Sequence, residues 1–254
     1  MEDKNILFVG DIHEKLDIVT HILDDLIFSL DFPIHEVVLV GDIFDSWDEK
    51  PGRALAAAKR IMYFTHPITK VTLLKANHEV QYYWPEERCS GWHSITEILF
   101  DEIKNDWFRL SKWFWSAENA LENGHAIICT HAGLNANFLQ GHVETGTQRG
   151  LDASVAIEWL QGWSRIQKHE QTDREHPFFH CGRKSGGRYM YGGILWSRPQ
   201  EGWESIPGVT QIFGHTSYRK GITPITPQDW GIDCLDGCKE LLLLREKKLE
   251  IIKF

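Results

Sequence analysis

The sequence lacks any long apolar segment, and none of its apolar runs approaches the roughly 20 residues that a transmembrane helix requires. The first residues are polar and acidic, which is unlike a secretory signal peptide. Cysteine is scarce and odd in number, with five residues and no spacing typical of a disulfide scaffold or a complete zinc motif. Together these absences predict a cytoplasmic protein with reduced thiols and no membrane partner.

Nucleotide-binding fingerprints are also missing, because neither a GxxxxGK[ST] phosphate loop nor a GxGxxG turn occurs, and no internal repeat is visible. Basic residues are outnumbered by acidic ones, 27 against 36, which gives a formal net charge of −9. This balance argues against general nucleic-acid binding. With 42% hydrophobic and 25% charged residues among 254, the composition is that of an ordinary globular protein.

Apolar runs and helical patterns alternate along the first 80 residues. The runs at 5–9, 36–40 and 71–74 are predicted strands, and the segments 13–30 and 52–64 are predicted helices. This order is typical of an α/β fold with a parallel sheet. Further strands are expected at 126–129, 212–214 and 232–233, followed by a closing hairpin of 241–244 with 249–252.

Two longer segments separate these strands, at about 80–124 and 134–193. The first is rich in tryptophan, and the second contains a helical pattern at 152–169. No linker rich in proline, glycine or serine marks a domain boundary. We therefore expect residues 1–254 to form one domain that carries both segments as insertions.

Polar residues able to bind metals follow five of the predicted strands. Taken singly, an Asp in such a place is more often a helix cap, and a lone His is more often a surface or core residue. The ordered set is improbable by chance, and ligands of open α/β sheets bind outside the carboxyl ends of the strands. The side chains are therefore expected to converge on one crevice. The motifs are Gly10-Asp11-Ile12-His13, Gly41-Asp42-Ile43-Phe44-Asp45, Ala76-Asn77-His78-Glu79, Thr130-His131-Ala132-Gly133 and Phe213-Gly214-His215-Thr216.

This ordered set resembles the calcineurin-like metallophosphoesterases, most closely the phosphoprotein-phosphatase branch with its bacterial and phage members. The resemblance extends from Gly10 to about Gly237, and Leu195-Trp196-Ser197-Arg198 is similar to a further motif of that branch. It implies an α/β sandwich of two packed mixed β-sheets flanked by helices. It also implies a metal-dependent phosphoric ester hydrolase with an anionic phosphorylated substrate.

Two divalent metal ions are implied by the same resemblance. Two carboxylates, one carboxamide and three imidazoles suit Mn, Fe or Zn rather than Ca. A bridging carboxylate holds two cations about 3.5–4 Å apart, and a hydroxide shared by them attacks the phosphorus. By resemblance, Asp11 and His13 hold the first metal, Asp42 bridges both, and Asn77, His131 and His215 complete the second.

The resemblance also assigns roles beside the metals. His78 matches the general acid, since an imidazole can hold and surrender a proton near neutral pH, and Asp45 matches the carboxylate that orients it. Glu79 either supports the site or is only an acid at a helix start. Arg198 matches the phosphate-binding Arg. Lys75 stands where related phage phosphatases have an Arg, with an exposed strand-end lysine as the alternative.

One departure from the family pattern affects phosphate binding. The branch has an Arg after the second Asp of the second motif, whereas Ser46 follows Asp45 here. A basic, Gly-rich stretch at 181–189 is predicted to supply the missing cation, with Arg183 and Arg188 as candidates. The alternative interpretation of this stretch is a flexible solvated loop.

The leading function is a phosphatase that hydrolyses phosphomonoesters of a protein or a small metabolite. A phosphodiesterase or dinucleoside polyphosphate hydrolase is the first alternative, in which Trp47 or Trp84 stacks on a base. An inactive binding module on the same fold is the second. The sequence leaves the metal, the native substrate and the oligomeric state open.

Overall fold

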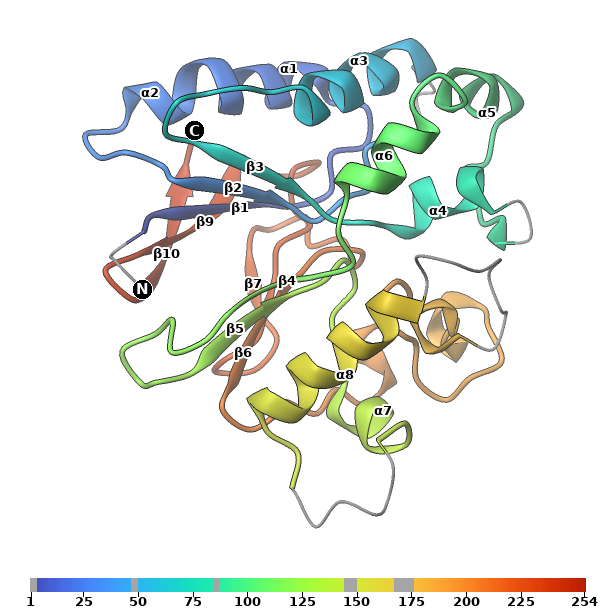
Figure 1. The fold of residues 1–254 in the computed structure, drawn as a ribbon, viewed down its shortest axis with the longest axis vertical. Coiled ribbons are helices and arrows are strands. Elements are labelled where there is room, and N and C mark those ends of the chain that lie inside the picture. Colours follow the sequence, from blue (N-terminus) through green and yellow to red (C-terminus); the bar gives the residue numbers. More distant parts are fainter. Residues whose placement is uncertain (1–3, 47–49, 85–86, 144–149, 167–175) are drawn as a thin grey trace.

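A computed structural model describes residues 4–46, 50–84, 87–143, 150–166 and 176–254. Two five-stranded β-sheets lie against each other, with helices on the outer sides (Figure 1). Each sheet contains both parallel and antiparallel strand pairs. The predicted α/β sandwich of two mixed sheets is thus confirmed.

The first sheet has the strand order β10-β9-β1-β2-β3. Its centre consists of parallel strands β1 (Ile6–Val9), β2 (Glu36–Leu39) and β3 (Lys70–Leu73). The hairpin of β9 (Glu240–Arg245) and β10 (Lys248–Lys253) pairs antiparallel with β1. Both ends of the chain therefore contribute to the same sheet.

The second sheet has the order β4-β5-β6-β8-β7. Parallel strands β5 (Ala126–Cys129), β6 (Val209–Phe213) and β8 (Trp230–Gly231) form its centre, and β4 (Trp115–Ala117) and β7 (Thr223–Pro224) lie antiparallel at its edges. Because β4 falls within the segment expected to be the first insertion, that segment contributes a strand to the sandwich itself.

Helices on the outer side of the first sheet form one layer at the top of Figure 1. In this layer α3 (Pro51–Met62) packs beside a continuous helical rod. The rod consists of α1 (Leu16–Thr20), a π-helical stretch (His21–Leu26) and α2 (Ile27–Ser29). The predicted helix of 13–30 begins three residues late, because His13 and Glu14 have φ of 41° and 61°, which an α-helix does not accommodate.

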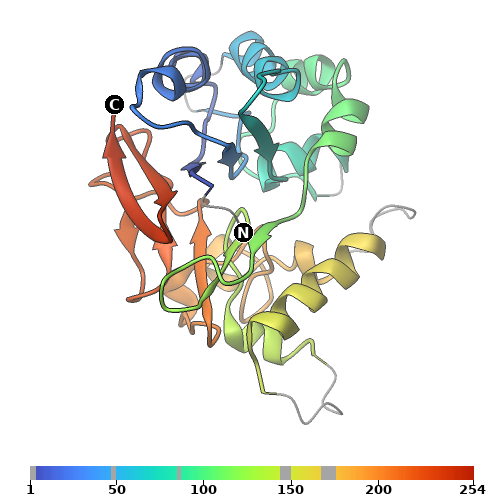
Figure 2. The ribbon, with the colours of Figure 1, turned by 60° about the vertical axis from the view of Figure 1, so that its left-hand side comes forward.

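The remaining helices lie beside α3 and on the side of the second sheet. α4 (Asn77–Tyr83), α5 (Ser94–Phe100) and α6 (Lys104–Leu110) follow β3, whereas α7 (Ala136–Gln140) and α8 (Ala153–Ile166) lie on the side of the second sheet, as Figure 2 shows from another direction. The predicted helix of 152–169 extends in part beyond the described residues. No described helix combines the length and the apolar composition that a bilayer span needs.

Alternate residues of the central strands enter two different apolar layers. Leu7 and Val9 of β1 pack toward the helices, while Ile6 and Phe8 pack against the second sheet. Burial on both faces explains the uninterrupted apolar runs in the sequence. The polar residues that follow each strand are therefore the first to leave the apolar layers, at the carboxyl edge of the sheets.

Candidate metal centre and catalytic residues

Loops from both sheets meet at this carboxyl edge. The backbone N–H of His13 donates to the carbonyl of Asp42 at 2.7 Å, which joins the loops after β1 and β2. The Asp11 carboxylate accepts the backbone N–H of His215 at 2.9 Å, which joins the two sheets. Gly214 is required for this approach, because a Cβ there would overlap the Asp11 carboxylate. The first and fifth motifs are thus in direct contact.

Asp11, His13 and Asp42 form one group of ligand atoms, all within 4.8 Å of one another. His13 Nδ1 lies 2.8 Å from the carbonyl oxygen of Asp45. Because a carbonyl only accepts, Nδ1 carries the proton and Nε2 presents a lone pair. Nε2 lies 4.0 Å from Asp11 Oδ2 and 3.9 Å from Asp42 Oδ2. Three acceptors therefore surround one position that suits a cation.

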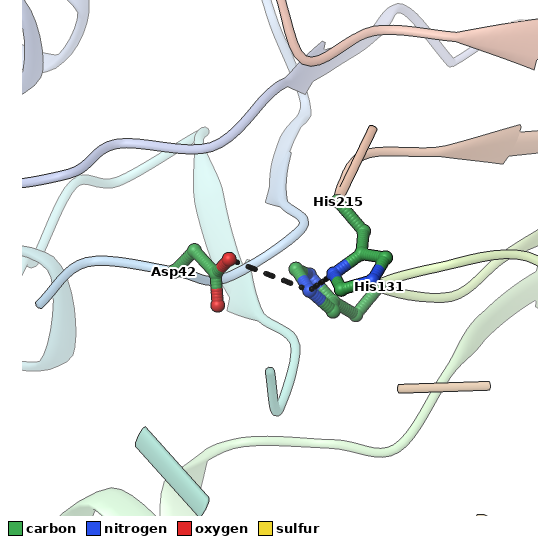
Figure 3. Close-up of side chains that lie close together, drawn as sticks. All are labelled: Asp42, His131 and His215. Atoms are coloured by element: carbon green, nitrogen blue, oxygen red, sulfur yellow. Dashed lines mark hydrogen bonds and ion pairs between the residues drawn. The ribbon is translucent and has the colours of Figure 1, made fainter. Parts of the chain in front are cut away.

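A second group surrounds His131, which is fully buried. Its Nδ1 donates to the carbonyl of Val40 at 3.0 Å, so Nε2 again presents a lone pair. Nε2 lies 2.7 Å from Asn77 Oδ1. It also lies 3.3 Å from His215 Nδ1 and 3.5 Å from Asp42 Oδ2, the two contacts drawn in Figure 3. Acceptors held this close repel one another, and a cation between them would remove that cost.

Asp42 Oδ2 is the atom that the two groups share, since it faces His13 on one side and His131 on the other. Asp42 itself is 2% exposed and has a φ of 47°, a left-handed backbone that aims its carboxylate between the groups. Gly41 before it has a φ of 100°, which favours glycine. Asp42 is therefore placed where a carboxylate would contact two cations at once.

Burial sets the protonation of these groups. Burial raises the pKa of Asp11 well above its ordinary value, and the charges of Asp233 and Asp42 raise it further. Burial, followed by repulsion from Asp42, raises the pKa of Asp233 to about 7. Burial lowers the pKa of His131 and His215, which favours the neutral imidazole that binds metals. The residues present therefore fit two divalent cations, which would stabilise the buried carboxylates. Sequence reasoning missed Asp233, although its place after β8 was a signal.

His78 and Asp45 form a hydrogen-bonded pair at the same edge. Asp45 Oδ2 lies 3.0 Å from His78 Nδ1, and His78 Nε2 lies 3.9 Å from Asp42 Oδ2. Burial lowers the pKa of His78, but attraction by Asp42 and the hydrogen bond to Asp45 outweigh it and raise the pKa to about 9. Nδ1 thus donates to Asp45, and the proton on Nε2 faces the two ligand groups.

Two further side chains of α4 hold Asp45 in place, and sequence reasoning missed both. Gln81 Nε2 donates to Asp45 Oδ2 at 2.6 Å, and the Tyr82 hydroxyl donates to Oδ1 at 2.5 Å. His78, Gln81 and Tyr82 are related as i, i+3 and i+4, which places them on one face of the helix. That spacing of three donors was the signal that would have identified them.

Glu79 supports the bridging loop rather than only beginning a helix. Its fully buried carboxylate accepts the backbone N–H groups of Asp42, Ile43 and Phe44 at 3.2, 2.5 and 3.1 Å. Burial and the charge of Asp42 raise the pKa of Glu79 to about 8. This residue therefore fixes the backbone that carries the shared ligand.

Arg198 lies beside the second ligand group. Its Nε donates to Ser185 Oγ at 2.8 Å, and that hydroxyl donates to the carbonyl of Trp196 at 3.1 Å. The charge of Arg198 contributes to lowering the pKa of His215, and the Trp196 ring meets the His215 ring edge-on at 5.5 Å. Ser185 belongs to the Gly-rich stretch, so this stretch holds the predicted phosphate-binding Arg.

Glu201, which sequence reasoning missed, organises the same stretch. Its carboxylate accepts the backbone N–H groups of Lys184, Gly192 and Arg198 at 3.2, 2.9 and 3.4 Å. Gly182 packs directly on this carboxylate, where a Cβ would overlap it. The glycine content of the stretch is thus explained in part by close packing on the Glu201 carboxylate.

The interpretation of Lys75 as an exposed strand-end lysine is wrong, while its role in binding phosphate stays a prediction that its observed contacts do not favour. Lys75 is only 2% exposed, so it is not a surface lysine. Its Nζ donates to the carbonyls of Phe108 and Ser111 at 2.8 and 2.6 Å and to Ser111 Oγ at 2.7 Å. It also lies 4.6 Å from the Phe108 ring centroid. Lys75 therefore stabilises the carboxyl end of α6.

Arg183 and Arg188 have no contact with the ligand groups among the described interactions. The Arg183 side chain is exposed. The Arg188 guanidinium lies 5.0 Å from the Tyr189 ring centroid, and its Nη2 donates to the Tyr189 hydroxyl at 2.8 Å. Their role in binding phosphate stays a prediction.

Ser46, which replaces the Arg of the related branch, donates to Glu14 Oε2 at 2.8 Å. The same Glu14 oxygen accepts the backbone N–H of Lys50 at 2.5 Å, so an acid anchors the loop where a cation was expected. Trp84 is buried against Trp113, which contradicts its proposed role in base stacking. Trp47 lies outside the described residues.

The family model described as calcineurin-like phosphoesterase matches residues 4–218. A similar solved structure is the cold-active protein-tyrosine phosphatase of a psychrophilic Shewanella species, with 17% identity, 98% of this chain and 77% of that chain covered, and a TM-score of 0.66.

A second similar structure is a Saccharomyces cerevisiae protein serine/threonine phosphatase with similarity to human phosphatase PP5. It has 15% identity, covers 99% of this chain and 80% of that chain, and has a TM-score of 0.55. At such identities these two structures support the fold alone. No curated protein sequence matches the chain.

Proposed function

The chain belongs to the calcineurin-like phosphoesterase family and is a metal-dependent phosphoester hydrolase, and from this premise we propose that it hydrolyses phosphomonoesters. The proposal depends above all on the orientation of His78. Its Nδ1 is held by Asp45 at 3.0 Å, while its Nε2 lies 3.9 Å from the Asp42 atom that both ligand groups share. A proton donor therefore faces the place where a phosphoryl group would react.

Two divalent transition metals, Mn, Fe or Zn, are the proposed cofactors. Asp11, His13 and Asp42 would hold the first. Asp42, Asn77, His131 and His215 would hold the second. When bound, such a pair supplies a water of lowered pKa as nucleophile and neutralises charge on the phosphoryl oxygens.

The side chains around this pair complete the proposed mechanism. His78 gives its Nε2 proton to the departing oxygen, and the Asp45 carboxylate stabilises the imidazolium before this transfer. The Arg198 guanidinium, tethered by Ser185, binds a phosphoryl oxygen and orients the ester. Glu79 holds the backbone of Asp42 by accepting its N–H.

The proposed substrate is a phosphoprotein or a small phosphorylated metabolite. The burial of Trp84 removes one of the two stacking residues on which the alternative of a phosphodiesterase or dinucleoside polyphosphate hydrolase depended. We further propose a cytoplasmic location, because all five cysteines are unpaired thiols.

A metal-reconstituted activity screen tests the proposal. Protein stripped by a chelator is reloaded with Mn²⁺, Zn²⁺ or Fe²⁺ and assayed on p-nitrophenyl phosphate and its bis ester, and then on phosphopeptides and nucleotides. We expect the monoester to be preferred and Asp42→Asn and His78→Ala to lose most activity. A clear preference for the bis ester would favour the diesterase, and inactivity with every metal and substrate would favour a binding module.

A further inference from the structure

Gln81 and Cys89 link the proposed metal ligand Asn77 to the pair His78–Asp45 through a series of hydrogen bonds. Gln81 donates from Nε2 to Asp45 Oδ2 at 2.6 Å, and its Oε1 accepts the backbone N–H of Cys89 at 3.0 Å. Cys89 Sγ in turn accepts from Asn77 Nδ2 at 3.8 Å. Because Asn77 and His78 are neighbours in α4, these contacts close a ring.

The thiol contact fixes which end of the Asn77 carboxamide faces the cation position. Asn77 Oδ1 lies 2.7 Å from His131 Nε2 and 3.1 Å from His215 Nδ1, on the side of the second ligand group. Its Nδ2 points the opposite way, toward Cys89. An amide oxygen binds a cation and an amide NH₂ does not, so an acceptor behind Nδ2 favours the productive orientation.

The segment from Cys89 to Gly91 also lies directly on the general-acid pair. A Cβ at Gly91 would lie 3.1 Å from Asp45 Cβ and 3.3 Å from His78 Cε1, tighter than ordinary contact. Gly91 has a φ of 88°, a conformation that favours glycine. The backbone of this segment therefore packs against both Asp45 and His78, and a side chain at position 91 would crowd them.

We propose that Gln81 and Cys89 are positioning residues that couple the orientation of Asn77 to that of the His78–Asp45 pair. The inference rests on the proposed function and deepens it. Gln81 is fully buried and uses both ends of its amide, one toward the pair and one toward the Cys89 backbone. Loss of either end would loosen both the metal ligand and the general acid, although neither Gln81 nor Cys89 contacts the reacting atoms.

The Cys89 half is tested by cobalt binding to the stripped protein, followed by absorption. Residues that orient metal ligands commonly contribute about 10–100-fold to affinity, so Cys89→Ala should weaken binding about tenfold. Cys89→Ser, which keeps an acceptor, should stay within about threefold of the native protein. Cys181→Ala removes another half-buried thiol that belongs to none of the candidate ligand groups of the described residues, and it is the matched control.

Two results would overturn this half of the proposal. The first is equal affinity of Cys89→Ala and the native protein. The second is a thiolate-to-cobalt charge-transfer band that disappears in Cys89→Ala and persists in Cys181→Ala, which would make Cys89 a ligand instead. Because cobalt binding needs no turnover, this result stands even if the proposed phosphatase activity fails.

The Gln81 half is tested by the dependence on the leaving group. Gln81→Met keeps the volume and removes both hydrogen bonds, so proton donation by His78 should become less efficient. We expect kcat on phenyl phosphate, whose leaving group needs a proton, to fall about tenfold or more, and kcat on p-nitrophenyl phosphate to fall less than about threefold. Equal losses on both substrates would show a merely structural role and overturn the proposal.

A second variant keeps this test decisive if Gln81→Met does not fold. Gln81→Glu is isosteric and retains the acceptor for the Cys89 N–H, but it places a carboxylate where a donor faced Asp45. The same leaving-group-dependent loss is expected. If the native protein hydrolyses neither ester, the proposed function is wrong. The coupling of Gln81 to Asn77 is then tested by cobalt titration of Gln81→Glu and the native protein. Equal cobalt affinities of the two proteins would refute the coupling.

Discussion

Asp45→Asn tests the proposed general acid His78 without removing any of the proposed metal ligands. The native carboxylate accepts from His78 Nδ1 at 3.0 Å, from Gln81 Nε2 and from the Tyr82 hydroxyl. An asparagine has only one accepting oxygen, and its NH₂ group would face donors. The predicted result is that Nδ2 of the new side chain donates to His78 Nδ1, which leaves a neutral imidazole.

The magnitude follows from the charged hydrogen bond that is lost. A hydrogen bond to a charged group contributes about 1.5–3 kcal/mol, and one pKa unit corresponds to about 1.4 kcal/mol. The pKa of His78, which its carboxylate neighbours raise to about 9, should therefore fall by about one to two units in the variant. Because the protonated form is the active acid, activity should be lost at lower pH than in the native protein.

The assay is the pH profile of kcat on phenyl phosphate at saturating metal. We expect the basic limb to move toward lower pH by about one to two units and the plateau to fall by about 10²-fold. Asp25→Asn is a matched control, since Asp25 pairs with His21 at 3.2 Å on the surface. A basic limb that stays in place, with an unchanged plateau, would refute the assignment of His78 and Asp45.

Three further outcomes are expected. Cation binding should tighten as pH rises, since Asp11, whose pKa burial raises well above its ordinary value, must lose a proton. Calorimetry in buffers of different ionisation heat counts the protons released, and binding without proton release would contradict this. Lys75→Met should lower the free energy of unfolding in urea by about 1–3 kcal/mol and leave kcat/KM of the folded protein unchanged. The reason is that it removes the donor to the buried Ser111 carbonyl and no substrate contact. A large rise in KM would instead indicate that Lys75 binds substrate. Ser185→Ala should raise KM and the Ki of inorganic phosphate by about 3–10-fold with little change in kcat, since it frees Arg198; a loss confined to kcat would argue against a binding role.

The periodicity of the sequence predicted the central parallel strands and the edge at which the site lies, whereas the two-sheet sandwich was implied by the family resemblance and the edge strands β4 and β7 were not predicted. Strands buried on both faces appear as short apolar runs, and the residue after each run must leave the apolar layer. Asp11, Asp42 and Asn77 follow three parallel neighbours, so their convergence follows from strand order alone. Predicting that these side chains group with His131 and His215 therefore did not require knowledge of individual side-chain conformations.

Directions of individual side chains within loops were not predictable in this way. Lys75 is two residues before Asn77, yet it points to α6, because the backbone alternates sides after β3 and the carbonyl of Ser111 is nearby. Glu201 follows a stretch without acidic residues and looked unrelated to it, although it accepts three of the backbone N–H groups of that region. Such contacts join segments whose distance in space the local sequence does not encode.

The backbone conformation of the site shows which contacts maintain its geometry. His13, Asp42 and Asp45 all have positive φ, a conformation that costs a residue other than glycine on the order of 1–3 kcal/mol. Contacts from other motifs help to offset these costs. The His13 N–H binds the Asp42 carbonyl, the His13 ring binds the Asp45 carbonyl, and Glu79 accepts the N–H groups at the start of the second loop. Each strained loop is thus held by another motif, so the ligand positions and the general acid form one cooperative unit. It follows that a substitution at Glu79, which contacts neither cation position nor substrate, should disturb metal affinity and proton donation together.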